Sequence, residues 1–111
     1  MEFVLSEPFE AEIARLTPDE YAQFRSAFEL FTTFVDGWVG GSVALYPLAD
    51  EFPPELGVHR VGDRWAFAWG AGAPHSPERA IFDWNPRATR ARRVIMRNVA
   101  TTHQGAYGAN K

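Results

Sequence analysis

Arginine is the residue type in this chain that offers the clearest chemistry. The 111 residues include ten arginines and a single lysine. A guanidinium group presents a planar fork of hydrogen-bond donors that matches the oxygen atoms of a phosphate. Because side chains at every second residue share one face of a β-sheet, arginines on neighbouring strands are expected to line one phosphate-binding groove. Five arginines fall in segments with a strand pattern: Arg60, Arg64, Arg79, Arg93 and Arg97.

Two of these arginines, Arg79 and Arg97, are flanked by apolar strand residues. We therefore predict that both lie at the border of the core rather than on a loosely solvated face. One interpretation is that they contact a bound phosphate. The alternative is that they form salt bridges with Asp83 and with the acidic N-terminal half of the chain.

His103 and Tyr107 follow the last predicted strand and add groups that can transfer a proton. Histidine titrates near neutral pH, and a phenol can orient a phosphate or share in proton transfer. To cleave RNA, an enzyme must take a proton from the 2′-hydroxyl, stabilise the charge of the phosphorane and protonate the 5′-oxygen. Arginine would stabilise the charge, and His103 and Tyr107 would move the protons.

Other catalytic patterns are missing from the sequence. It contains no G-x-S-x-G, no phosphate loop ending in Gly-Lys-Ser and no H-E-x-x-H. The three histidines, His59, His75 and His103, lie on separate segments without the spacing of a metal site. We therefore predict that the protein uses neither a metal nor a cofactor.

The net charge of −3 conceals two oppositely charged halves. Residues 1–55 contain eleven acidic and two basic residues, a local charge of −9. Residues 56–111 contain nine basic and three acidic residues, a local charge of +6. Either the two halves attract each other within the fold, or the C-terminal half presents a face that binds an anion.

Length and composition indicate one small domain that spans residues 1–111. The chain has no cysteine, which excludes a disulfide framework and favours a reducing, cytoplasmic location. It has no run of 18 apolar residues and no basic N-terminal patch followed by an apolar stretch. Neither a transmembrane helix nor a secretory signal is therefore expected, and no membrane partner is predicted.

Two helices are predicted in the first third of the chain. Ser6 is a suitable N-cap for a helix over about 7–15. Thr17-Pro18-Asp19-Glu20 forms a capping box at the start of a second helix over about 18–35. The second helix carries an apolar stripe that predicts a core-facing side. Its members are Tyr21, Phe24, Phe28, Phe31 and Val35.

Strands make up most of the rest, although the Gly- and Pro-rich residues 37–57 are not assigned to any element. Residues 2–5 form a short predicted strand, and residues 58–69 form a hairpin with a type II′ turn. Residues 79–84 and 93–99 complete a meander. The expected fold class is α+β, with two N-terminal helices packed on an antiparallel sheet of about four to five strands.

Alternation along the strands predicts which side chains share a face. Trp65, Phe67 and Trp69 share one face, which favours a place in the core, although Trp65 and Trp69 could instead stack on RNA bases. On the last strand, the residues predicted to share a face are Arg93, Ile95, Arg97 and Val99.

These patterns together resemble the RelE/ParE superfamily of type II toxin–antitoxin toxins, and within it the HigB-like mRNA interferases. The acidic helical pair before the sheet is similar to that of the family. Residues 52–61 (FPPELGVHRV), followed by Trp65, resemble the segment by which the family's chain enters its hairpin. Arg79-Ala80-Ile81-Phe82 is similar to the strand that holds a phosphate-contacting arginine. Residues 94–107 (VIMRNVATTHQGAY) resemble the last strand and its tail.

The resemblance implies a metal-independent endoribonuclease that cleaves mRNA, on the ribosome, and is neutralised by a cognate antitoxin protein. It implies that Arg79, His103 and Tyr107 are catalytic, and it makes Arg60 and Arg97 auxiliary phosphate contacts. Arg64 and Arg93 are further candidates for RNA binding, because they lie on the same predicted strands. The alternative is a non-catalytic protein of the same fold, either a ParE-like toxin that binds DNA gyrase or an interaction module.

Overall fold

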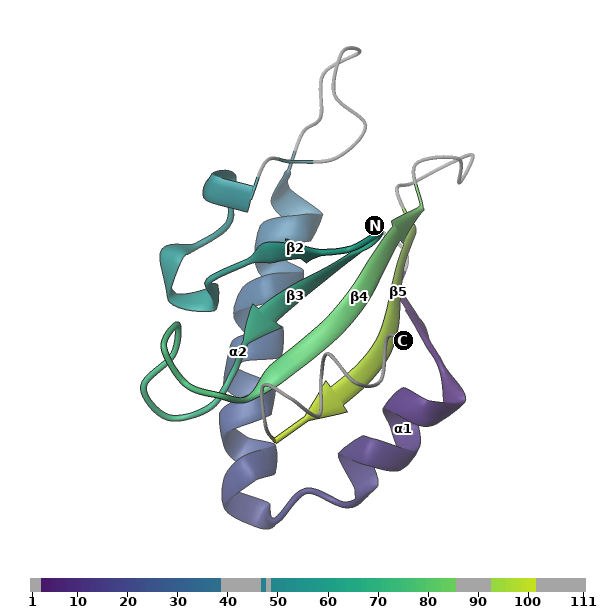
Figure 1. Cartoon of the computed structure of the whole chain (residues 1–111), viewed down its shortest axis with the longest axis vertical. Coiled ribbons are helices and arrows are strands. Elements are labelled where there is room, and N and C mark those ends of the chain that lie inside the picture. The colour runs from purple at the N-terminus through teal and green to yellow at the C-terminus, as the bar shows by residue number, and fades with distance from the viewer. Residues whose placement is uncertain (1–2, 39–46, 48, 86–92, 102–111) are drawn as a thin grey trace.

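Two helices pack on one face of a five-stranded sheet (Figure 1). In the computed structural model of the chain, residues 3–38, 47, 49–85 and 93–101 are described. The sheet order is β1-β5-β4-β3-β2. In chain order the elements are β1 (Phe3–Leu5), α1 (Glu7–Ala14), α2 (Pro18–Gly37), two 3-10 turns (Ala49–Glu51 and Pro54–Leu56), β2 (His59–Val61), β3 (Arg64–Ala68), β4 (Arg79–Asn85) and β5 (Arg93–Ala100).

This architecture confirms the predicted α+β class. Strands β2 to β5 form the predicted antiparallel meander. The first strand differs, because β1 pairs in parallel with β5 and makes the sheet mixed. The two helices carry the chain from β1, at one edge of the sheet, to β2 at the opposite edge.

Local signals place the starts of both helices as predicted. The Ser6 hydroxyl caps α1 by accepting a hydrogen bond from the Phe9 amide at 3.2 Å. Thr17 and Glu20 form both bonds of the capping box, at 3.2 and 2.9 Å. These reciprocal bonds satisfy amide groups that the first turn of a helix leaves without partners.

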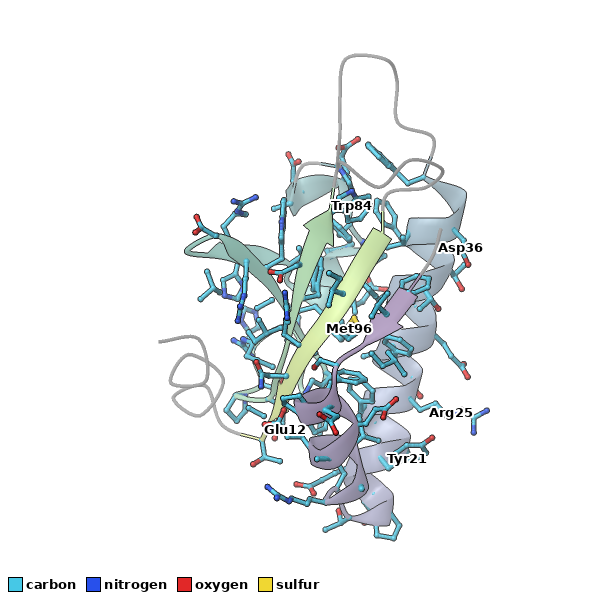
Figure 2. The ribbon with its side chains drawn as sticks, turned by 90° about the vertical axis from the view of Figure 1, so that its right-hand side faces the viewer. Glu12, Tyr21, Arg25, Asp36, Trp84 and Met96 are labelled. Carbon is cyan, nitrogen blue, oxygen red and sulfur yellow. The ribbon has the colours of Figure 1, made fainter. Side chains whose placement is uncertain are left out.

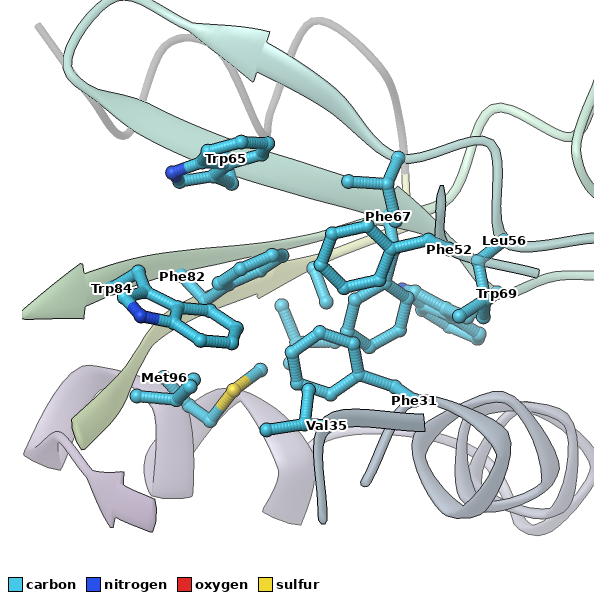
Figure 3. Close-up of a cluster of buried hydrophobic side chains, with 14 of the residues drawn as sticks. Phe31, Val35, Phe52, Leu56, Trp65, Phe67, Trp69, Phe82, Trp84 and Met96 are labelled. Carbon is cyan, nitrogen blue, oxygen red and sulfur yellow. The ribbon is translucent and has the colours of Figure 1, made fainter. Parts of the chain in front are cut away.

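The core lies between α2 and the sheet and is rich in aromatic rings (Figure 3). Phe31 is fully buried, with its ring centroid 4.8 Å from that of Phe67 and 4.7 Å from that of Phe82. Trp65 and Trp69 are buried as well, so the core interpretation of these residues is confirmed and the RNA-stacking alternative is wrong. Tyr21 departs from the predicted stripe, because it remains 45% exposed in the first turn of α2, beside α1.

The hairpin between β2 and β3 has the predicted two-residue turn. Gly62 has a φ of +60°, and Asp63 has no positive φ, as a type II′ turn requires. The turn fixes the register, so that Val61 lies opposite Arg64 and Arg60 lies opposite Trp65.

A β-bulge in β5 corrects the predicted pattern of that strand. Ile81 pairs with Asn98 and Phe82 pairs with Met96, so Arg97 is an extra residue between the two pairs. The extra residue reverses the alternation beyond it. Val99 is therefore buried in the core with Val94 and Met96, instead of sharing a face with Ile95 and Arg97.

Helix α1 covers the part of β5 that extends past the short strand β1. The Ser6 hydroxyl donates a hydrogen bond to the Arg97 carbonyl oxygen at 2.9 Å. The Glu12 carboxylate accepts bonds from the Val99 amide at 3.0 Å and from the Asn98 side chain at 3.2 Å. Side chains of α1 thus take the place of a neighbouring strand and protect this edge of β5.

Replacing Glu12 with alanine is expected to lower the free energy of unfolding by about 1–2 kcal/mol, because the Val99 amide would lose its acceptor. Urea denaturation measures this change. Glu12→Gln, which keeps an acceptor oxygen, should recover most of the loss. Glu10→Ala, an exposed change in the same helix, should cost less than about 0.5 kcal/mol. Equal losses for Glu10→Ala and Glu12→Ala would contradict the role of Glu12 as an edge cap.

Candidate anion-binding face

The face of the sheet opposite the helices carries a charged cluster of Arg64, Asp83 and Arg97. The Nε atom of Arg97 lies 2.6 Å from Oδ2 of Asp83, and Nε of Arg64 lies 3.3 Å from Oδ1. One carboxylate thus bridges two guanidinium groups. All three side chains are part-buried, with exposed fractions of 37% for Arg97, 34% for Arg64 and 22% for Asp83.

Sheet register brings these three residues together. Trp65 pairs with Phe82, so the preceding Arg64 lies beside Asp83 on the next strand. Asp83 pairs with Ile95 on its other side, and the bulge in β5 places Arg97 within reach of the same carboxylate. The salt bridge between Arg97 and Asp83, posed as an alternative from the sequence, is confirmed.

The cluster keeps a net charge of +1, because two guanidinium groups share one carboxylate. Arginine binds phosphate through several donors in one plane, and a partner carboxylate can hold such a side chain in position. The arrangement is therefore suited to an anion that approaches the sheet between β3 and β5.

Arg79 lies on the same face of β4 as Asp83, four residues away, or about 13 Å along the strand. Its guanidinium Nη1 donates hydrogen bonds to the backbone carbonyls of Ser76 and Glu78, the latter at 2.8 Å. These bonds tie Arg79 to the loop that precedes β4. The structure does not bring Arg79 to Arg97, and its contacts in the described part of the chain are those of a loop anchor.

The loop beside Arg79 contains several buried polar atoms. Ser76 is only 4% exposed. Within the described ranges, four buried side-chain atoms have no hydrogen-bond partner: Trp69 Nε1, Ser76 Oγ, Glu78 Oε1 and Arg79 Nε. A buried polar group without a partner costs free energy, so at these four atoms burial is not matched by hydrogen bonds within the described part of the chain.

The other predicted site residues are separated from the cluster or lie beyond the description. Arg60 faces the helix side of the sheet, where its guanidinium carbon is 4.6 Å from the ring centroid of Trp65. Arg93 pairs with Asn85 through the backbone, but its side chain is not described. His103 and Tyr107 lie outside the described residues.

No family model, curated protein or solved structure matches this chain. Any function of the chain is therefore inferred from the chemistry of its own residues. Within the described ranges, no group of three or more histidine, aspartate or glutamate side chains is placed to hold a metal ion. No helix found there has the length and apolar character needed to cross a membrane.

His59 is a histidine on the same face of the sheet as the cluster, and no sequence motif indicates it. His59 pairs with Ala66 of β3. Ala66 is two residues after Arg64 and lies on the same face of the sheet, so the imidazole of His59 lies on that face too. The Nδ1 atom is 3.1 Å from the Gly57 carbonyl oxygen. A carbonyl can only accept, so Nδ1 carries the hydrogen and the neutral ring has its lone pair on Nε2. The available signal was the alternation along β2, which puts His59 on the same face as Val61, together with the two-residue turn that places Val61 opposite Arg64.

Proposed function

We propose that this protein is the toxin of a type II toxin–antitoxin system, similar to the RelE/ParE superfamily, and that it cleaves mRNA without a metal. The observation that supports the proposal best is the cluster in which Asp83 holds Arg64 and Arg97 on the sheet face opposite the helices. The two N-terminal helices on a sheet agree with the fold expected of such toxins. The chain would act in the cytoplasm, on ribosome-bound mRNA.

In the proposed reaction, the RNA 2′-oxygen attacks the adjacent phosphorus and the bond from phosphorus to the 5′-oxygen breaks. Arg64 and Arg97 stabilise the charge that develops on the phosphorane oxygens. His103 takes the proton of the 2′-hydroxyl. Tyr107 orients the phosphate or protonates the leaving 5′-oxygen. The products are a 2′,3′-cyclic phosphate and a 5′-hydroxyl end.

Incubating the purified protein and its variants with RNA, alone and on ribosomes, tests this proposal. We expect cleavage with cyclic phosphate ends, and a loss of at least about tenfold in rate for Arg97→Ala and His103→Ala. Arg25→Ala, an exposed arginine on the helical layer, is the matched control and should cleave within about twofold of the parent. Absence of cleavage in the parent would reject the nuclease, and equal cleavage rates in all variants would reject the assignment of Arg97 and His103 to its site.

Arg79→Ala distinguishes a catalytic arginine from a loop anchor. If Arg79 binds the scissile phosphate, cleavage falls while the melting temperature is nearly unchanged. If its bonds to the Ser76 and Glu78 carbonyls are its main role, the melting temperature falls with activity. Measuring both quantities on the same preparation separates the two roles.

The second candidate is a non-catalytic toxin that binds a protein target such as DNA gyrase. Two contacts favour it: Asp83 offsets part of the arginine charge, and Arg79 is engaged by its own loop. Expression in a bacterial host discriminates the candidates. The nuclease predicts arrested translation with loss of mRNA, whereas the gyrase binder predicts a DNA-damage response with intact mRNA.

A further inference from the structure

His59 is a close neighbour of the arginine cluster on the sheet. It pairs with Ala66 of β3, and Arg64 is the second residue before Ala66 on that strand. The intervening Trp65 belongs to the core. Figure 2 shows α2 along one face of the sheet, and His59 and Arg64 belong to the opposite face. The two residues are therefore diagonal neighbours about 7–8 Å apart, which is within reach of long side chains.

A backbone carbonyl orients the ring of His59. The Nδ1 atom lies 3.1 Å from the carbonyl oxygen of Gly57, which can only accept a hydrogen bond. The hydrogen is therefore on Nδ1 in both the neutral and the protonated ring, and Nε2 is the atom that gains or loses a proton. The ring can thus change its protonation state without turning.

The fold holds this carbonyl in place. Gly57 ends the 3-10 turn Pro54–Leu56 with a φ of +53°, a left-handed conformation that favours glycine. A Cβ atom at position 57 would lie 2.7 Å from the Cβ atom of Pro74, closer than two such atoms can approach without a shift of the chain. The close contact between the turn and the loop therefore fixes the group that orients His59.

Arg64 links His59 to the rest of the candidate site. Its Nε atom is 3.3 Å from Asp83, and the same carboxylate contacts Arg97. A phosphate bound by Arg64 would therefore lie beside the imidazole. Cleavage of the phosphodiester requires a proton for the 5′-oxygen, and imidazolium is the side chain that donates a proton most readily near neutral pH.

We infer that His59 is the general acid of this site, the group that protonates the leaving 5′-oxygen. The inference rests on the proposed nuclease function. As the bond from phosphorus to the 5′-oxygen breaks, the proton on Nε2 moves to that oxygen, which leaves a 5′-hydroxyl and a neutral imidazole. His103 takes the proton of the 2′-hydroxyl, and Tyr107 orients the phosphate. Proton exchange with water then returns both histidines to their starting states.

An RNA in which sulfur replaces the bridging 5′-oxygen of one linkage tests this role. A thiol is a much stronger acid than an alcohol, with a pKa of about 8.5, so the sulfur leaves without a proton. We expect His59→Ala to cleave the oxygen substrate about 100-fold or more slowly than the parent does, and the sulfur substrate within about threefold of the parent. His59→Gln keeps a hydrogen-bond donor but transfers no proton, so it should behave like His59→Ala.

His75→Ala is the matched control. It removes an exposed histidine from the loop before β4, and it should match the parent on both substrates. Cleavage of the sulfur substrate also reports on folding, because a variant that had lost its structure would be slow on both substrates.

Three results would overturn the role of His59 while leaving the nuclease intact. They are cleavage of the oxygen substrate by His59→Ala at the rate of the parent, slow cleavage of both substrates by that variant, and recovery on the sulfur substrate by Tyr107→Phe instead. A parent that cleaves neither substrate would reject the nuclease proposal itself, and the role of His59 with it.

Discussion

Replacing Phe31 with alanine is expected to lower the free energy of unfolding by about 3–5 kcal/mol. The ring is fully buried and lies within 5 Å, between centroids, of both Phe67 and Phe82. It therefore joins α2 to two neighbouring strands, and its removal would leave a cavity that a rigid sheet cannot close. The free energy of unfolding of a small domain is about 5–15 kcal/mol, so the variant would lose much or all of its stability.

Urea denaturation followed by tryptophan fluorescence measures this effect, since several of the tryptophans lie in the same core. Phe31→Leu fills part of the space and should cost less than the alanine variant. Tyr21→Ala removes an aromatic ring from an exposed position of the same helix and should cost less than about 1 kcal/mol. Similar losses for Phe31→Ala and Tyr21→Ala would contradict the central place of Phe31 in the core.

If the arginine cluster binds RNA as we propose, replacing Asp83 with asparagine is expected to strengthen that binding, whereas Arg97→Ala is expected to weaken it. Asparagine removes the negative charge that Arg64 and Arg97 share but keeps the size of the side chain. The charge of the cluster rises from +1 to +2. For single-stranded RNA, each added phosphate contact steepens the dependence of log affinity on log salt by about 0.7. We expect affinity about threefold to tenfold higher at low salt, with the gain lost at high salt.

Fluorescence anisotropy of a labelled RNA oligonucleotide across a salt series gives both the affinity and the slope. Asp19→Asn makes the same charge change at an exposed site on α2 and is the matched control. It should change the affinity by less than about twofold. If Asp83→Asn instead weakens binding as Arg97→Ala does, then Asp83 acts by holding the two guanidinium groups in place rather than by offsetting their charge.

Local patterns predicted most of the fold. The start of α2 follows from the capping box, because both of its bonds form within four residues. The hairpin follows from Gly62, which can adopt the positive φ that a type II′ turn requires. These features depend on neighbours in sequence, so they can be identified without knowing the rest of the structure.

The candidate site was less predictable, because it depends on register. The predicted two-residue turn already implies that Arg60 lies opposite Trp65, on the other face from Arg64. The bulge at Arg97 could not be predicted, because the alternation of residue types along β5 does not reveal which residue stays unpaired. That one residue then changes the face of every residue beyond it. The contacts of Arg79 depend on the path of an irregular loop, which alternation does not describe.

The contacts of α1 with β5 also determine when the molecule can acquire its shape during synthesis. Ser6 and Glu12 bond to residues 86 to 91 positions later in the chain, and β1 has β5 as its neighbour in the sheet. On the ribosome, these hydrogen bonds and the pairing of β1 with β5 can therefore form only after the last strand has emerged. Since Arg97 is on that same strand, the charged cluster cannot be complete before β5 has been synthesised. A nascent chain would accordingly contain the acidic segments of both helices well before it could complete the arginine face.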